Sequence, residues 1–176
     1  MKNFRKSMVA FVLAAFAVVP AAAELPVGAK APTFSTKAAL AGKEFGFNIN
    51  VALARGPVVL YFYPKAFTKG CTLEANAFAE AMPKFRALGA SVVGMSNDDI
   101  ETLKRFSREE CRDAFPVGVA SKSVIDAFDV GLSGSSLAGR TSYVIAQDGK
   151  IVMVYSNSDY RDHVSKTLAA VRSLKK

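Results

Sequence analysis

The chain has 176 residues, 51% of them hydrophobic, and a formal net charge of +8 at pH 7. This length suits one domain with a single core. The basic residues are spread along the chain, and no basic run is longer than a pair such as Lys175-Lys176. The sequence therefore argues against a nucleic-acid-binding protein, which would cluster its Lys and Arg residues.

The first 23 residues have the pattern of a secretory signal peptide. A positively charged start is followed by an apolar run over residues 8–19 and by the small residues Ala21-Ala22-Ala23. As a helix this apolar run rises about 18 Å, less than the ~30 Å hydrocarbon core of a bilayer. We therefore expect cleavage after Ala23, a folded domain over residues 24–176 and a periplasmic or secreted protein. The alternative is an uncleaved membrane anchor.

The early part of this domain is predicted to be mostly irregular. Pro26 and Pro32 break any helix over residues 25–34. Residues 43–47 suit a short strand, and Asn50 can cap a short helix that runs through Ala54.

A buried strand and an amphipathic helix come next. The run VVLYFY at residues 58–63 is typical of a central strand covered on both faces, and Pro64 ends it. From Cys71 to Gly89, apolar residues then recur at helical spacing. They are Ala75, Phe78, Met82 and Phe85.

The rest of the chain alternates between strands and helices. The predicted elements are a strand over 91–95, a helix opened by the capping box Asp98-Asp99-Ile100-Glu101, a strand over 117–120, a helix over 124–128, two strands over 141–145 and 151–155, and a last helix with Val164, Leu168 and Val171 on one face. The turn Asp148-Gly149 joins the two late strands as a hairpin. This order predicts an α/β sandwich with a mixed sheet. A cysteine between a buried strand and a helix makes it similar to the thioredoxin fold.

Cys71 stands at the start of a predicted helix, where a thiolate is favoured. The first helical turn has free N–H groups and the positive end of the dipole, and the thiolate is the reactive form of cysteine. Gly70 lets the backbone approach closely, and Thr68 can offer its hydroxyl to the sulfur or to a bound oxygen. The alternative is that Cys71 is merely a small apolar residue.

The turn before this helix lacks the first cysteine of a Cys-x-x-Cys motif. It reads Thr68-Lys69-Gly70-Cys71, so dithiol exchange within one turn is not available. This favours a single attacking thiolate over a disulfide oxidoreductase.

The spacing Pro64-x-x-x-Thr68-x-x-Cys71 resembles the active-site signature of the peroxiredoxins. Further segments are similar to that family and extend the match over nearly all of residues 24–176. They are Ala31-Pro32-Thr33-Phe34, the strand at 58–64, and residues 139–145 with the hairpin at 148–151. The subfamily it resembles most is the bacterioferritin-comigratory, or Q-type, peroxiredoxins.

The resemblance implies a thiol peroxidase that reduces hydrogen peroxide and organic hydroperoxides, with a thioredoxin-like dithiol as the reductant. It implies that Pro64 shields the site, and that Thr68 and Arg140 bind the peroxide oxygens and hold the thiolate. Donors fixed toward the charge that develops on the leaving oxygen lower the barrier. Only the resemblance distinguishes Arg140 from a solvated surface charge. Glu74 can orient Arg140, or simply suit the helix dipole as a first-turn acid.

The second cysteine departs from the commonest Q-type arrangement. Many members carry it five residues after the first, where this chain has Asn76. Other members use a cysteine in the helix after the next strand, which makes Cys111 the candidate for an intramolecular disulfide with Cys71. The alternatives are a buried core cysteine and a permanent structural bridge, which is common in exported proteins.

The remaining expectations concern ligands and partners. His163 is the only histidine, and a metal needs three or four ligands, so we interpret His163 as structural and expect neither metal nor cofactor. We expect no membrane partner after cleavage, and a monomer or weak homodimer. The competing functions are an exported thioredoxin-like exchange protein and a non-catalytic exported domain held by a Cys71–Cys111 bridge.

Overall fold

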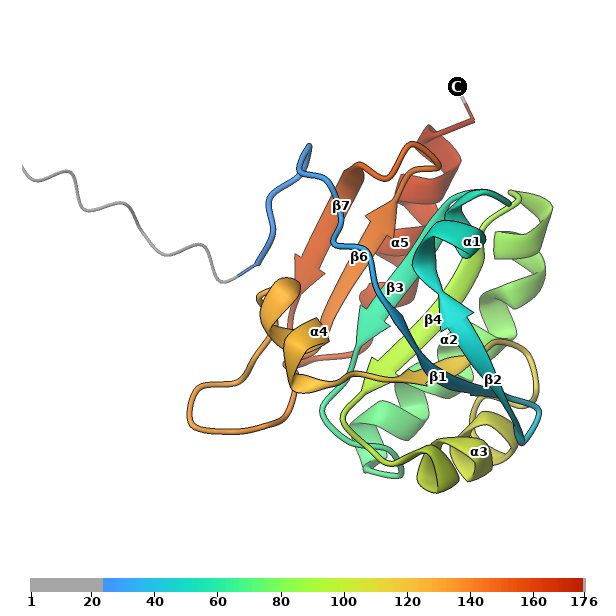
Figure 1. The fold of residues 1–176 in the computed structure, drawn as a ribbon. Helices are drawn as coiled ribbons and strands as arrows, with labels where there is room; N and C mark the ends of the chain where they lie inside the picture. The colour runs from blue at the N-terminus through green and yellow to red at the C-terminus, as the bar shows by residue number, and fades with distance from the viewer. Residues whose placement is uncertain (1–23, 176) are drawn as a thin grey trace, which may run out of the picture.

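The centre of the molecule is a seven-stranded mixed sheet (Figure 1). The computed structural model describes residues 24–175, so the predicted signal peptide over residues 1–23 lies outside the described residues. The strands are β1 (Ser35–Leu40), β2 (Lys43–Asn48), β3 (Val58–Phe62), β4 (Ser91–Ser96), β5 (Val117–Val119), β6 (Thr141–Ile145) and β7 (Ile151–Ser156). They lie in the order β2-β1-β5-β4-β3-β6-β7.

The middle of the sheet is parallel and its two sides are antiparallel. β4 pairs in parallel with both β3 and β5, whereas β6 runs antiparallel to β3 and to β7. The carboxyl ends of β3 and β4 therefore lie at the same edge of the sheet. The start of β6 reaches this edge too, because Thr141 pairs with Phe62.

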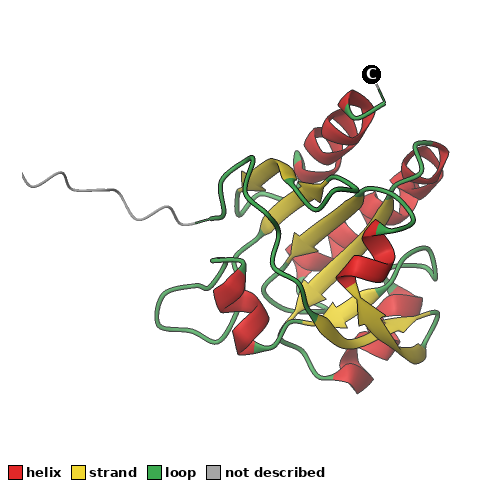
Figure 2. Ribbon diagram, turned by 45° about the horizontal axis from the view of Figure 1, so that its top comes forward, coloured by secondary structure: helices red, strands yellow, loops and turns green. Residues whose placement is uncertain are grey.

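Helices cover both faces of the sheet (Figures 1 and 2). They are α1 (Ile49–Leu53), α2 (Lys69–Ala87), α3 (Ile100–Glu109), α4 (Lys122–Ala127) and α5 (His163–Ser173). The apolar sides of α2, α3 and α5 share one core cluster, and those of α1 and α4 share the cluster on the opposite face. None of the helices among residues 24–175 is long and apolar enough to cross a membrane.

The predicted central strand is confirmed as β3, whose five residues are all buried. Val59 and Tyr61 point toward α2, and the alternate residues point toward the other core. The ring of Tyr61 stacks on Phe78 of α2 with centroids 4.4 Å apart. This packing fixes α2, and with it Cys71, against the sheet.

Several details of the sequence prediction need correction. β1 is not predicted, because its sequence STKAAL lacks strong strand formers; pairing with β2 and β5 forms it. Asn48, not Asn50, caps α1 by accepting a hydrogen bond from the Val51 N–H group. Asp99, not Asp98, caps α3 by accepting from Thr102 N–H, which leaves Asp98 free for another contact.

Candidate active site

Cys71 lies in the first turn of α2, at the carboxyl edge of β3. It is the third residue of the helix, its N-cap is Thr68, and it is only 2% exposed. Cys71 therefore lies at the positive end of the helix dipole, in the turn whose N–H groups have no partner within the helix. Cys71 and Cys111 are both free thiols.

Arg140 brings a positive charge to this sulfur from the start of β6. Its Nη2 group donates to Sγ of Cys71 over 3.4 Å, and its Nε group donates to the Ser158 carbonyl oxygen over 3.0 Å. Nη1 donates to the carboxylate of Glu74, one turn after Cys71. The structure thus brings together Cys71, Arg140 and Glu74, with the Arg140 side chain 8% exposed.

Gly70 leaves the room that this guanidinium needs. A Cβ atom at this position would lie 3.1 Å from Nη2 of Arg140, a contact too tight for most side-chain carbons. The sequence predicts only that Gly70 allows a close approach to the backbone. In the structure the group that approaches is the Arg140 guanidinium.

Thr68 and Pro64 lie in the segment between β3 and Cys71. Pro64 is the second residue after β3 and is half-buried. The Thr68 side chain is exposed, and its hydroxyl donates to the Lys65 carbonyl oxygen over 2.9 Å. The structure therefore does not show the predicted bond from this hydroxyl to the sulfur. Contact between Thr68 and a bound peroxide oxygen stays a prediction.

Asp98 holds the loop that leads to Cys71, a role missed in the sequence. Its Oδ2 atom accepts from Ala66 N–H over 2.7 Å and from the Ser96 hydroxyl over 2.8 Å. Phe67, which follows Ala66, has a positive φ of 63°. This backbone conformation is energetically costly for any residue other than glycine. Its ring packs edge-on against Phe106. These contacts keep the loop in one shape.

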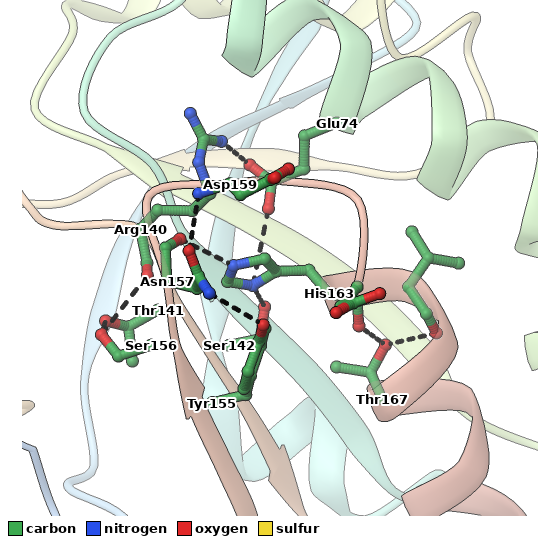
Figure 3. Close-up of polar contacts among 12 residues, drawn as sticks. Glu74, Arg140, Thr141, Ser142, Tyr155, Ser156, Asn157, Asp159, His163 and Thr167 are labelled. Carbon is green, nitrogen blue, oxygen red and sulfur yellow. Dashed lines mark hydrogen bonds and ion pairs between the residues drawn. The ribbon is translucent and has the colours of Figure 1, made fainter.

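A buried polar cluster lies behind Arg140 (Figure 3). The Glu74 side chain is fully buried, and burial raises its pKa to about 8 although the charge of Arg140 opposes this. Its second oxygen, Oε1, is without a hydrogen-bond partner among the described residues and lies 3.7 Å from Nδ1 of His163. That separation is too long for a hydrogen bond.

His163 occupies the first position of α5 and is also fully buried. Its Nδ1 atom lies 2.8 Å from the Ser142 hydroxyl, and its Nε2 atom lies 3.0 Å from the Asn157 carbonyl oxygen. Burial lowers the pKa of the imidazole below its usual value, so the ring is neutral at pH 7. No local pattern predicts these contacts, because Ser142 and Glu74 are distant from His163 in the chain and Asn157, six positions away, contributes only a backbone carbonyl.

Cys111 lies just beyond α3, in the same core cluster as Cys71. Its side chain is fully buried. Burial raises the pKa of the Cys111 thiol well above its usual value, and the charges of Glu110 and Asp113 raise it further. Unlike Cys71, Cys111 has no cation against its sulfur among the described contacts. The two cysteines thus have different environments: a guanidinium donates to the sulfur of Cys71, whereas burial disfavours the anion of Cys111.

Comparisons with known proteins agree with this geometry. The profile of the AhpC/TSA family matches residues 27–154. Peroxiredoxin Q from Sedum lineare chloroplasts is 33% identical over 157 residues, which cover 87% of this chain and 81% of the relative. A putative peroxiredoxin from Mycobacterium tuberculosis is 37% identical over 131 residues, covering 72% of this chain and 85% of the relative.

Solved structures give the same result. The crystal structure of peroxidoxin BcpB from Mycobacterium tuberculosis superposes with a TM-score of 0.77 and 33% identity, covering 85% of this chain and 98% of that one. Peroxiredoxin Q from Xanthomonas campestris superposes with a TM-score of 0.68 and 27% identity, covering 80% and 91%. The chain therefore belongs to the AhpC/TSA family and is a thiol peroxidase of the peroxiredoxin type, with Q-type members among its relatives.

Proposed function

We propose that Cys71 is the residue with which this peroxiredoxin attacks hydrogen peroxide and organic hydroperoxides. The observation that carries the proposal is the Arg140 guanidinium, 3.4 Å from a sulfur in the first turn of a helix. The thiolate forms a bond to one peroxide oxygen while the O–O bond breaks. The leaving oxygen takes a proton and departs as water or an alcohol, and Cys71 becomes a sulfenic acid.

Arg140 serves this step by its charge and its placement. A guanidinium keeps its charge at any physiological pH, so it stabilises the thiolate before the reaction and the leaving oxygen during it. Glu74 and the Ser158 carbonyl hold the other side of the guanidinium. The donor is thus fixed before peroxide arrives.

We also propose that Cys111 regenerates the site. The sulfenic acid of Cys71 condenses with the Cys111 thiol, which forms a disulfide and releases water. A thioredoxin-like dithiol then reduces the disulfide by exchange. Because Cys111 is fully buried in the reduced protein, this step requires the turn around Cys111 to open.

The turn around Cys111 combines features that favour opening with contacts that oppose it. Arg112 and Asp113 both have positive φ angles, 50° and 56°, and such backbone costs of order 1 kcal/mol or more per residue without glycine. Against this, Glu110 accepts from Asn76, and Arg112 pairs with Glu80 on the surface of α2. The Arg112–Glu80 pair is exposed and therefore weak, whereas the Asn76–Glu110 bond is partly buried and opposes opening more.

Apolar burial also opposes this opening, although residues 107–113 are polar in sequence apart from Cys111. Cys111 belongs to a cluster with the buried aromatic residues Tyr61, Tyr63 and Phe106. Ser107, although polar, is also fully buried, and its hydroxyl accepts from Gly42 N–H over 2.9 Å. Opening must therefore expose part of the core, and the strained backbone at residues 112 and 113 offsets some of that cost.

Replacing Cys111 by serine should leave the first reaction with peroxide intact and stop the cycle after it. The variant should consume one equivalent of peroxide, fail to turn over with a dithiol reductant, and over-oxidise at Cys71 to the sulfinic acid. Stopped-flow peroxide consumption followed by mass spectrometry measures both effects. C111A is the matched control, because it also lacks the thiol but adds no buried hydroxyl.

Normal turnover of both C111S and C111A would show that Cys111 is a core residue and that the enzyme works with one cysteine. In the wild-type protein, one equivalent of peroxide should yield a peptide that links Cys71 to Cys111. Absence of that peptide would contradict the resolving role while leaving the peroxidase function of Cys71 untouched.

We further propose that the protein acts in the periplasm or outside the cell, after removal of its first 23 residues. The support is the charged start, the short apolar run and the Ala-Ala-Ala exit of the sequence. N-terminal sequencing of the protein recovered from the exported fraction should begin at Glu24. A full-length product that stays with the membrane or the cytoplasm would contradict this localisation.

A further inference from the structure

Among residues 24–175, His163 is the one fully buried basic side chain, and the peroxide reaction as described above does not use it. Its surroundings come from five parts of the fold: Glu74 on α2, Ser142 on β6, Tyr155 on β7, Asn157 in the following loop and Asp162 before α5. The imidazole packs edge-on against the Tyr155 ring, with centroids 4.8 Å apart. A buried polar ring needs partners for both nitrogens, and this one has them.

The partners fix which nitrogen of the ring carries the proton. A carbonyl oxygen can only accept, so Nε2 of His163 donates to Asn157 O over 3.0 Å. In the neutral ring Nδ1 is then the acceptor, and it accepts from the Ser142 hydroxyl over 2.8 Å. The ring therefore has a single orientation and a single tautomer.

His163 binds the carbonyl of Asn157, and the next residue in this loop, Ser158, accepts a hydrogen bond from Arg140 (Figure 3). Asn157 N–H donates to the Arg140 carbonyl oxygen over 3.2 Å, and Asn157 Oδ1 accepts from Asp159 N–H over 2.8 Å. Between them, the Ser158 carbonyl accepts from Nε of Arg140 over 3.0 Å. His163 thus fixes the position of the acceptor that orients the guanidinium.

The same ring also bounds Glu74, the other support of the guanidinium. Nδ1 lies 3.7 Å from Oε1 of Glu74, while the other carboxylate oxygen accepts from Nη1 of Arg140. The imidazole therefore closes the space behind the carboxylate. The ring contacts this carboxylate without a hydrogen bond, so its hold on Arg140 runs through the carbonyls of Asn157 and Ser158.

We propose that His163 is a positioning residue for peroxide reduction, which acts by holding the Asn157 carbonyl, and through it the adjacent Ser158 carbonyl, so that Arg140 faces Cys71. It does not touch the reacting sulfur. The inference rests on the proposed roles of Cys71 and Arg140. The proposal goes beyond the structural role predicted for His163, because the residue is then expected to affect the reaction rate as well as the stability of the fold.

Two substitutions separate the contacts of the ring. In H163N the shorter amide reaches the place of Nδ1 and can meet Ser142, but it does not reach the Asn157 carbonyl. In H163Q the amide N–H can reach that carbonyl. H163N should slow the first reaction of the reduced enzyme with hydrogen peroxide on the order of 10- to 100-fold, as expected for a misplaced catalytic group. H163Q should recover most of that loss.

T167V is the matched control on the same helix. Thr167 is as buried as His163, but its hydroxyl donates only to the helix carbonyls of His163 and Val164. T167V removes a buried polar contact from α5 without reaching Arg140. It should lower the thermal midpoint of unfolding and leave the peroxide rate at the wild-type value. An equal slowing in T167V would show that any damage to α5 has this effect, and would overturn the proposal.

A double-mutant cycle with R140A shows whether His163 acts through the arginine. If it does, H163N should slow the wild-type enzyme but add no further slowing in the R140A background. Equal slowing in both backgrounds would overturn the proposal. If R140A alone keeps the wild-type rate, the proposed function of Arg140 fails; if R140A slows the reaction but H163N does not, only the role of His163 fails.

The single histidine also allows a test that needs no altered His163. In untagged, 15N-labelled protein at pH 7, the imidazole should give the signals of a neutral ring with a slowly exchanging Nε2 proton. R140A should shift those signals, since it removes the partner of the Ser158 carbonyl. A ring that averages between tautomers, or signals unchanged in R140A, would overturn the proposal even if the His163 variants fail to fold.

Discussion

Replacing Cys71 by serine is expected to abolish peroxide turnover, the largest effect of any single substitution in this protein. A serine hydroxyl is not ionised at neutral pH and is a weak nucleophile without an adjacent base. The Arg140 guanidinium, which donates to the sulfur, can stabilise an anion but cannot take the hydroxyl proton. The rate of peroxide loss should fall by roughly 10³-fold or more, to the background of the uncatalysed reaction.

The measurement is steady-state peroxide consumption with a dithiol reductant, beside the single reaction of the reduced protein. C111S serves as the comparison, because it keeps Cys71 and should still perform the first reaction. Cys71 is 2% exposed and packs in the core, so circular dichroism must show that C71S keeps its fold. A folded C71S variant with wild-type turnover would be incompatible with the proposed chemistry.

Arg140→Ala is expected to give the second-largest effect. Loss of one preorganised donor to developing negative charge typically costs roughly 10²- to 10³-fold in rate, and R140A also removes the cation that supports the thiolate. The second-order rate with hydrogen peroxide should fall by about that factor. The rate of Cys71 alkylation by iodoacetamide at pH 7 should fall as well, because the thiolate is the form that reacts.

R140A leaves Glu74 buried without its partner, which could unfold the protein if the carboxylate kept its charge. Because burial raises the pKa of Glu74 and R140A removes the charge that opposes this rise, the carboxyl of the variant takes up a proton at neutral pH instead. The double variant R140A/E74Q removes the charge altogether and should show the same loss of rate. If R140A/E74Q is folded and reacts at the wild-type rate, the proposed role of Arg140 is wrong.

The parts of the fold that the sequence predicted well are those with a local signal. The run VVLYFY predicted β3 because every residue of that strand is buried. The helical spacing of Ala75, Phe78, Met82 and Phe85 predicted α2, and all four are buried against the sheet. β1 escaped prediction because pairing with neighbouring strands, rather than its own residues, makes it a strand.

Within the site, the roles of residues close to Cys71 in the chain could be predicted from the sequence, and those of residues from distant segments could not. Arg140 lies 69 positions from Cys71, and only the resemblance to a family singled it out. Asp98 looked like a helix cap because a capping residue and a loop anchor have the same local pattern; the Ala66 N–H group that it binds is 32 positions away.

His163 illustrates the same limit more sharply. A lone histidine with no ligand-type neighbours in sequence is usually structural, and nothing near it suggested otherwise. Glu74 and Ser142 meet it only because α2 and α5 pack on the same face of the sheet that contains β6. Asn157, six positions away, meets it through the loop before α5. Contacts of this kind depend on the tertiary arrangement and leave no periodic pattern in the chain.

The most direct test of the role of Cys71 is to locate the first oxidation product. Fully reduced C111S and C71S, each with one cysteine, are mixed with one equivalent of hydrogen peroxide in the presence of dimedone, which labels sulfenic acids, and their peptides are analysed by mass spectrometry. The proposed mechanism predicts near-stoichiometric label on Cys71 in C111S and none on Cys111 in C71S, because only Cys71 has a cation against its sulfur. Label on Cys111 together with an unlabelled Cys71 would contradict it.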